Sequence, residues 1–243
     1  MAIKKDDFVE LDYTAKLKDT NEVFDTTSLE VAKKAGLKTQ DLRFAPVIAK
    51  VGSRTVIPGL DAALVGKEPG KFSVDLQPEQ AFGKKDPKFI QLVNTAKFIE
   101  QKIQPVIGLQ VNIEGHIGTI RSVTGGRTMV DFNHPLSGRE ISYDVTIKRI
   151  VTDKKEQAKA AFEWMRFMPR EWDIKGDKAV VMVAKPVPDT VKNPVTAQFK
   201  HFTGMDLEFE LRKQDLAEEK SPSANSSPDA KVQKPKAQKK LTD

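Results

Sequence analysis

Strict alternation of apolar and polar side chains marks two long strands. From Val9 to Leu17 every second residue is apolar, which is the period of a strand with one buried face, and the same period runs from Ile141 to Val151. Residues 71–76 predict a further strand. Residues 44–51 predict another that is interrupted by Pro46, which places it at a sheet edge or a bulge.

Two short helices are predicted between these strands. Residues 29–35 have a helical pattern that Gly36 would end. Further along, Leu60, Ala63 and Leu64 fall on one face of a helix, and Gly66 suits its C-terminal end.

Residues 86–135 predict a small unit of their own. Its strand candidates are 109–113, 116–123 and 128–132. Gly125-Gly126 separates the last two and is a strong hairpin signal, because glycine takes positive φ at little cost.

The pattern becomes helical after residue 152. A helix is predicted over 154–168, stopped by Pro169, and a strand over 179–184. A second helix is predicted to start at the cap Asn193 with Pro194 as its first residue, and a second strand covers 205–211. This helix–strand–helix–strand unit supports only a small core, so association with a partner would help it.

The last segment, 216–243, is rich in Lys, Ser, Pro and Gln and predicts a disordered tail. The whole chain of 243 residues has 40 basic and 34 acidic side chains, with no basic stripe that would favour specific nucleic-acid binding. It has no Cys, which excludes disulfides, thiolate metal sites and a Cys nucleophile. No apolar run approaches a membrane span or a signal peptide, so we expect a cytoplasmic protein without a membrane partner.

None of the common catalytic motifs is present: the sequence has no GxSxG, Walker A, HExxH or GxGxxG pattern. What stands out is a group of apolar and aromatic residues around VIPGLDAAL (56–64). Periodicity alone would assign these residues to a core.

Five segments in order resemble the FKBP-type peptidyl-prolyl cis–trans isomerases, in particular the SlyD-like kind with a second domain inserted in the flap. They are FVELDYTAKL (8–17), VFDTT (23–27), GSRTVIPGLDAALVGKEPGKFSVDLQPEQAFG (52–83), NHPLSG (133–138) and SYDVTIKRI (142–150). Each segment alone is weak, but the ordered combination is specific. The position of NHPLSG after a long insert indicates the insert-in-flap kind.

The resemblance implies an α+β fold. Residues 1–86 and 137–152 would form an antiparallel half-barrel sheet around a short helix, and residues 87–136 a small β-rich insert. Residues 153–215, the α/β module, are similar in element order to the C-terminal domain of long archaeal members, which use it to dimerise.

The resemblance also implies an apolar pocket. Its predicted catalytic residues are Tyr13, Phe24, Asp25, Val56, Ile57, Leu60, Phe82 and Tyr143, with Leu136 at the rim. Asp25 would orient the pocket, either by bonding Tyr13 or by contacting the substrate carbonyl, and the sequence leaves both open. Leu60 stands where many single-domain relatives have Trp.

Phe82 departs from the family pattern, which has Tyr at this position. A Tyr hydroxyl can donate a hydrogen bond to a substrate carbonyl and Phe cannot. Such a bond contributes about 0.5–1.5 kcal/mol, up to roughly tenfold in rate, so we expect weaker activity or an altered preference rather than none.

The expected chemistry needs no metal or cofactor, and none is predicted. Rotation about an X–Pro bond faces a barrier of about 18–20 kcal/mol because resonance stiffens the amide. The twisted transition state is less polar at the amide oxygen, so a dry apolar pocket favours it over the planar ground state.

In related proteins the insert binds extended, unfolded chains. Here strand addition along an open sheet edge is the expected mode, and the predicted client-binding residues are Phe89, Ile90, Leu92, Val93, Phe98 and Ile99.

The predicted function is therefore a prolyl isomerase with chaperone activity. Its partners would be unfolded or nascent polypeptides containing X–Pro bonds and a second copy bound through 153–215. Two alternatives stay open. One is a holdase chaperone without useful catalysis, and the other is a scaffold whose partners are set by the C-terminal module and tail.

Overall fold

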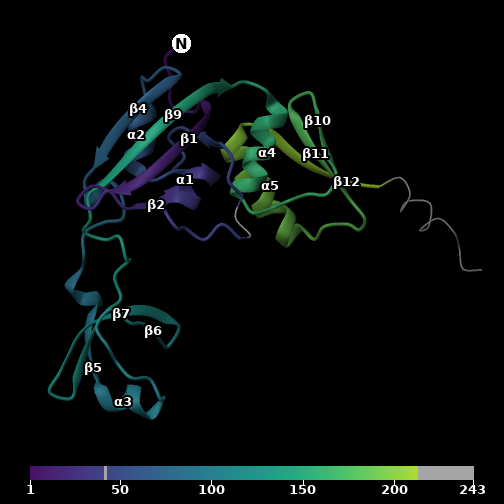
Figure 1. Ribbon diagram of the computed structural model, residues 1–243. Helices are drawn as coiled ribbons and strands as arrows, with labels where there is room; N and C mark the ends of the chain where they lie inside the picture. Colours follow the sequence, from purple (N-terminus) through teal and green to yellow (C-terminus); the bar gives the residue numbers. More distant parts are fainter. Residues whose placement is uncertain (41–42, 213–243) are drawn as a thin grey trace, which may run out of the picture.

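The computed structural model describes residues 1–40 and 43–212 and has three parts, each with its own sheet (Figure 1). The first part is the isomerase-like domain, built from both ends of the segment 1–152. The second is the insert, which is connected to it by two chain crossings. The third follows residue 152. The predicted tail at 216–243 lies outside the described residues.

The sheet of the first domain is antiparallel and follows the predicted alternation. It contains β1 (Phe8–Leu17), β2 (Val23–Thr26), β3 (Val47–Lys50), β4 (Gly70–Leu76) and β9 (Ile141–Val151). The strand order is β2-β1-β9-β4, and β3 pairs with the first half of β1. This arrangement, with few helices, confirms the predicted α+β fold.

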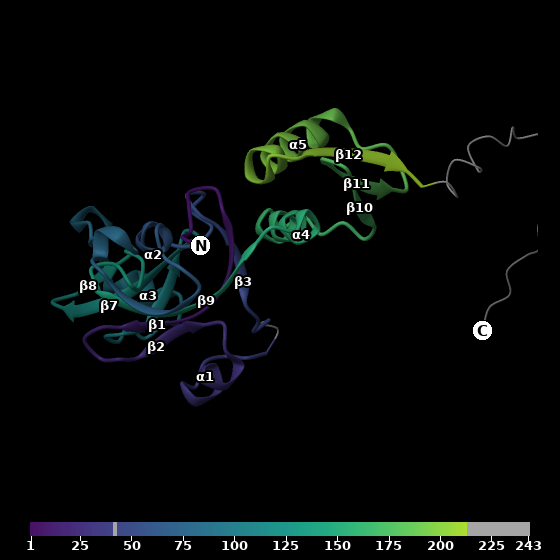
Figure 2. The same cartoon turned by 90° about the horizontal axis from the view of Figure 1, so that it is seen from above.

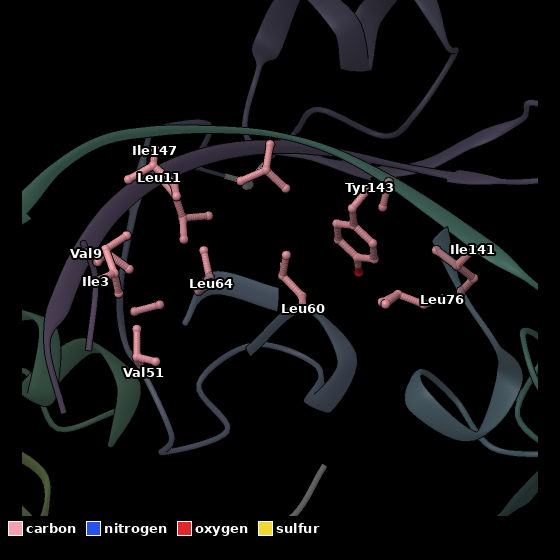
Figure 3. Close-up of a cluster of buried hydrophobic side chains, with 13 residues drawn as sticks. Ile3, Val9, Leu11, Val51, Leu60, Leu64, Leu76, Ile141, Tyr143 and Ile147 are labelled. Carbon is pink, nitrogen blue, oxygen red and sulfur yellow. The ribbon is translucent and has the colours of Figure 1, made fainter. Parts of the chain in front are cut away.

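Two helices lie on opposite faces of this sheet (Figure 2). Helix α1 (Leu29–Lys34) begins at the cap Ser28, and helix α2 (Pro58–Leu64) covers the concave face. Between α2 and the sheet lies the main core, in which Leu60 and Leu64 meet side chains such as Leu11 (Figure 3). The burial of these side chains is what holds the curved sheet around the helix.

The insert is a four-stranded antiparallel sheet with one short helix. Its elements are the 3₁₀ turn η2 (Pro87–Phe89), β5 (Ile90–Asn94), α3 (Thr95–Glu100), β6 (Gln110–Ile113), β7 (His116–Thr124) and β8 (Arg127–Asp131), and the strand order is β5-β8-β7-β6. Strand β5 and helix α3 were not predicted, because their short apolar run has neither a clear period of two nor one of 3.6. The core consists of Phe98, Val111, Ile120 and Val130.

The C-terminal module differs from the prediction in three respects. It contains α4 (Lys154–Trp164), β10 (Trp172–Lys175), β11 (Lys178–Val183), α5 (Asp189–Thr203) and β12 (Asp206–Leu211), so a strand, β10, was missed. Helix α4 ends at the cap Met165, before Pro169 is reached. Helix α5 begins at Asp189 and takes up Pro194 in its interior, where the prediction had placed Pro194 at the start.

The module also shares its core with the isomerase-like domain. Phe8 of β1 and Val151 of β9 are buried together with Phe162, Phe199 and Phe202 of the module. The rings of Phe8 and Phe202 meet edge to face at 5.5 Å. The partner that the small module needs to complete its core is therefore supplied within the chain.

Candidate active site

A groove opens on the concave side of the first sheet, beside helix α2. Its volume is about 530 Å³. Seven of the predicted catalytic residues line it: Tyr13, Asp25, Val56, Ile57, Leu60, Phe82 and Tyr143. They come from three strands, the loop before α2, the helix itself and the turn after β4, so folding brings together residues that are far apart in the sequence.

The two tyrosines come from neighbouring strands β1 and β9. Their ring centroids lie 5.6 Å apart, with the rings tilted by 52°. The hydroxyl of Tyr13 donates a 2.8 Å hydrogen bond to Oδ2 of Asp25 on β2. Of the two roles that the sequence left open for Asp25, this geometry favours the one in which it orients Tyr13.

Burial raises the pKa of the Tyr13 hydroxyl well above its ordinary value, and the negative charge of Asp25 and the hydrogen bond to it raise it further. Burial, together with Asp25, also raises the pKa of Tyr143. Both phenols are therefore neutral throughout the physiological pH range, and the Tyr13 hydroxyl stays a donor.

The loop that carries Val56 and Ile57 is held by a buried carboxylate. Asp61 of α2 is only 6% exposed and accepts the backbone N–H groups of Gly52, at 2.9 Å, and Arg54, at 3.3 Å. Arg54 takes a left-handed backbone conformation with φ of 55°. These bonds turn the chain so that Val56 and Ile57 face the groove.

Phe82 forms the opposite wall and packs against two aromatic neighbours. Its ring meets Phe24 edge to face at 6.1 Å and stacks on His134 at 4.7 Å with an interplanar angle of 1°. Phe24 does not line the groove itself but supports Phe82. Leu136 is half-buried against the main core of this domain and does not line the groove, and its N–H donates to Nδ1 of His134.

The 3₁₀ turn η1 (Pro78–Gln80), which precedes Phe82, sits directly on the helix. A Cβ at Gly59 would lie 2.7 Å from the Leu76 side chain and 2.8 Å from the carbonyl oxygen of Gln80. Only glycine allows this approach, so Gly59 sets the position of the Phe82 wall.

Sequence reasoning missed four residues of the site. Arg54, Thr55 and Pro58 line the groove, and His134 supports its wall. The first three are sequence neighbours of the matched pair Val56-Ile57, so their place near the groove could have been predicted from the sequence. The stacking of His134 depends on the return of the chain from the insert and had no local signal.

The residues predicted to bind clients divide into two groups. Phe89, Leu92 and Ile99 are 53%, 60% and 65% exposed, and Ile90 is 37% exposed. Val93 is half-buried against the insert core. Phe98 needs a correction: it is 3% exposed and lies in the core itself, because α3 turns this side chain onto β6, β7 and β8.

The fold and the groove define a class of protein, an FKBP-like domain with an insert in its flap. The family model for the FKBP-type peptidyl-prolyl cis–trans isomerase matches residues 1–100, and the model described as "FKBP26, IF domain" matches residues 91–136.

Curated relatives agree with both matches. The chain is 30% identical to the short-type peptidyl-prolyl cis–trans isomerase of Methanocaldococcus jannaschii, over 63% of this chain and 98% of the relative. It is 32% identical to the FKBP-type 16 kDa isomerase of Escherichia coli K12, over 43% of this chain and 74% of the relative. It is 26% identical to the SlyD isomerase of Treponema pallidum, over 62% and 79%. The chain belongs to the FKBP-type peptidyl-prolyl cis–trans isomerases, and its activity is the isomerisation of X–Pro peptide bonds.

None of the helices in the described part is long and apolar enough to cross a membrane. Within residues 1–40 and 43–212, no three His, Asp or Glu side chains gather into a set that could hold a metal ion.

Proposed function

We propose that this chain isomerises X–Pro bonds in the groove between Tyr13 and Phe82 and that its insert captures unfolded clients for the groove. The observation that carries the first part is the lining itself. Aliphatic and aromatic side chains form most of the walls. The polar side chains are the paired Tyr13 and Asp25, together with Arg54 and Thr55 beside Val56.

Such a groove suits a reaction that makes or breaks no covalent bond. As the X–Pro amide twists, its oxygen loses the negative charge that resonance gives it, and water no longer stabilises the planar form once the bond is enclosed. The groove then binds the twisted state better than the planar one, which is the requirement for acceleration. Leu60, Val56 and Ile57 would contact the proline ring.

The client-binding part rests on one edge of the insert sheet. Strand β5 pairs only with β8 among the described strands, so its other side carries free backbone N–H and C=O groups. Ile90 and Leu92 are exposed on this strand, and Phe89 is exposed just before it. An extended peptide can add to such an edge through main-chain hydrogen bonds and place alternate side chains on the apolar residues.

Strand β5 is also the first strand that the chain forms after leaving the groove. Phe82 lines the groove, and β5 begins at Ile90. A client segment added along β5 would therefore be held close to the catalytic groove, which raises the effective concentration of its X–Pro bonds there.

The test combines two substrates and two variants. Tetrapeptide isomerisation measures the groove alone, and refolding of a proline-limited protein measures the groove and client capture together. Asp25→Ala is expected to slow both reactions. Deleting 87–136 is expected to slow only the refolding reaction and to abolish suppression of aggregation.

A chaperone in which client holding outweighs a weakened isomerisation is the second candidate, and Phe82 is the observation that favours it. The wall residue has no hydroxyl to offer a substrate carbonyl. In that case the chain would suppress aggregation strongly, and both substrates would be isomerised only slightly faster than in buffer.

A further inference from the structure

The insert is joined to the isomerase domain by two crossings, residues 83–89 and 131–138, which we call the stalk (Figure 1). Backbone hydrogen bonds close the stalk at both ends. The N–H of Gly138 donates to the carbonyl of Gly83, and the N–H of Phe132 donates to the carbonyl of Phe89, each at 2.8 Å. Two crossings joined only at these points would leave the middle of the stalk free to bend.

A buried carboxylate at the insert end reaches into this middle segment. Asp131, the last residue of β8, is 3% exposed and accepts four hydrogen bonds. Oδ2 receives Nζ of Lys85 at 2.9 Å and Nε of Arg121 at 3.1 Å. Oδ1 receives the backbone N–H of Asn133 at 3.0 Å and its Nδ2 at 2.8 Å. Lys85 belongs to the outgoing crossing and Asn133 to the returning one, so the carboxylate binds the two together.

Asn133 completes the link. Its Oδ1 accepts the backbone N–H of Asp86 at 2.9 Å, and its Nδ2 donates to the carbonyl of the same residue at 3.1 Å. The side chain thus pairs with one residue of the opposite crossing as a strand neighbour would. Burial alone would raise the pKa of Asp131, but the hydrogen bonds from Lys85 and Asn133 outweigh it and hold this pKa well below its usual range. The carboxylate is therefore charged at any pH at which the protein works.

The stalk ends at the wall of the groove. Ser137 donates a 3.0 Å hydrogen bond from Oγ to the carbonyl of Phe82, and His134 stacks on the Phe82 ring. The returning crossing is thereby anchored to the groove wall by contacts that do not involve the side chains of Asp131 or Asn133. No part of the reaction itself uses Asp131 or Asn133, since neither lines the groove.

We propose that Asp131 and Asn133 are positioning residues, which fix the direction in which the insert projects from the groove so that a client on β5 is presented to it. This inference rests on the proposed client binding by the insert. Without the link, the insert would still fold and hold a client, but the client would reach the groove in many orientations and few of them would be productive.

The test compares Lys85 and Arg121, which both donate to Oδ2 of Asp131 but lie in different parts of the chain. In the double variant Lys85→Gln/Asn133→Ala the two crossings lose their side-chain link, and Asp131 keeps Arg121. The matched control, Arg121→Gln, removes a donor that lies within the insert and leaves the crossings linked. Since the chain has no Cys, spin labels can be placed cleanly at Glu68→Cys and Glu100→Cys, one in each domain, in otherwise intact protein.

Pulsed electron paramagnetic resonance then measures the spread of distances between the labels. We expect a narrow distribution in the parent protein and in Arg121→Gln, and a broad one in the double variant. With a proline-limited refolding protein, kcat of the double variant should fall by about fivefold or more with little change in KM, and tetrapeptide isomerisation should be unaffected. Should the double variant unfold the insert, Lys85→Gln alone, which keeps three of the four bonds to Asp131, is measured in the same way. Because Asn133 still bonds Asp86, this variant should broaden the distance distribution and lower the refolding kcat to a smaller extent.

Three results would overturn the proposal: an equally narrow distribution without the link, a broad distribution with unchanged refolding kcat, or a parallel loss of tetrapeptide isomerisation. A different result would refute client binding by the insert. If the insert binds no client, deletion of 87–136 leaves the refolding reaction as fast as in the parent protein, whatever distances the spin labels report.

Discussion

The hydrogen bond from Tyr13 to Asp25 offers the sharpest test of how the groove works. Tyr13→Phe removes the donor, and Asp25→Asn removes the negative charge of the acceptor. If Asp25 acts by orienting the Tyr13 ring, both variants act on the same hydrogen bond: Tyr13→Phe abolishes it, and Asp25→Asn keeps a neutral acceptor and weakens it. The combined effect should then be close to that of Tyr13→Phe alone.

The magnitude follows from the environment of the pair. A hydrogen bond to a charged group contributes about 1.5–3 kcal/mol when it is buried. Asp25 is exposed, which reduces the expected contribution to about 1 kcal/mol. Each single variant should therefore lower kcat/KM about fivefold, with a coupling between them of about 1 kcal/mol.

The assay is isomerisation of a proline tetrapeptide, because it does not involve the insert. Tyr143→Phe is the matched control. It removes a hydroxyl from the same groove, but one that forms no hydrogen bond within the described residues, so its effect should be smaller. Additive losses in the double variant, or a large loss in Asp25→Asn with none in Tyr13→Phe, would show that Asp25 acts on the substrate directly and would refute this reasoning.

Four further predictions concern the same structure. Gly59→Ala should lower the free energy of unfolding by about 1–3 kcal/mol in denaturant titrations, and it should also lower kcat because the turn before Phe82 has to move. The control is Ala62→Gly at an exposed position of the same helix, which should lower stability and leave kcat unchanged. Phe82→Tyr should raise kcat/KM by up to about tenfold, and an unchanged value would mean that no substrate carbonyl lies within reach. The pKa of Tyr13 is raised, so the stabilisation of its neutral form is complete below pH 10 and is lost only as the pH rises through the shifted pKa. The value of kcat/KM should therefore be constant from pH 6 to 9, and a step in that range would contradict this assignment. Because Phe8 and Val151 complete the core of the C-terminal module within one chain, a homodimer through 153–215 would have to form on the outer surface of the module. It should sediment as two copies at micromolar concentration, and a single copy at every concentration would remove that prediction.

Much of the isomerase domain was predictable because its strands obey a local rule. The alternation in 9–17 and 141–151 is the alternation of buried and exposed faces that the sheet imposes. The positions of Tyr13, Val56 and Phe82 in one groove came from the family resemblance, not from periodicity. The distance between the Tyr13 hydroxyl and Asp25 could not be read from the sequence at all.

The errors arise where tertiary contacts outweigh local preference. Pro194 usually starts a helix, yet α5 extends one turn further toward the N-terminus and continues through it to bury Phe199 and Phe202 against Phe8. Phe98 was assigned to the surface, because apolar density alone does not tell which side chains of a small domain form its core. The bonds of Asp131 join residues up to 46 positions apart and leave no short-range pattern.

The central claim is that one chain couples a prolyl isomerase groove to client capture by its insert. It is tested most directly by comparing kcat/KM for a proline tetrapeptide and for a proline-limited refolding protein, in the full chain and after deletion of 87–136. The account predicts that the deletion leaves the tetrapeptide value near that of the full chain and lowers the refolding value by at least about tenfold. Equal losses on both substrates, or no loss on either, would contradict it.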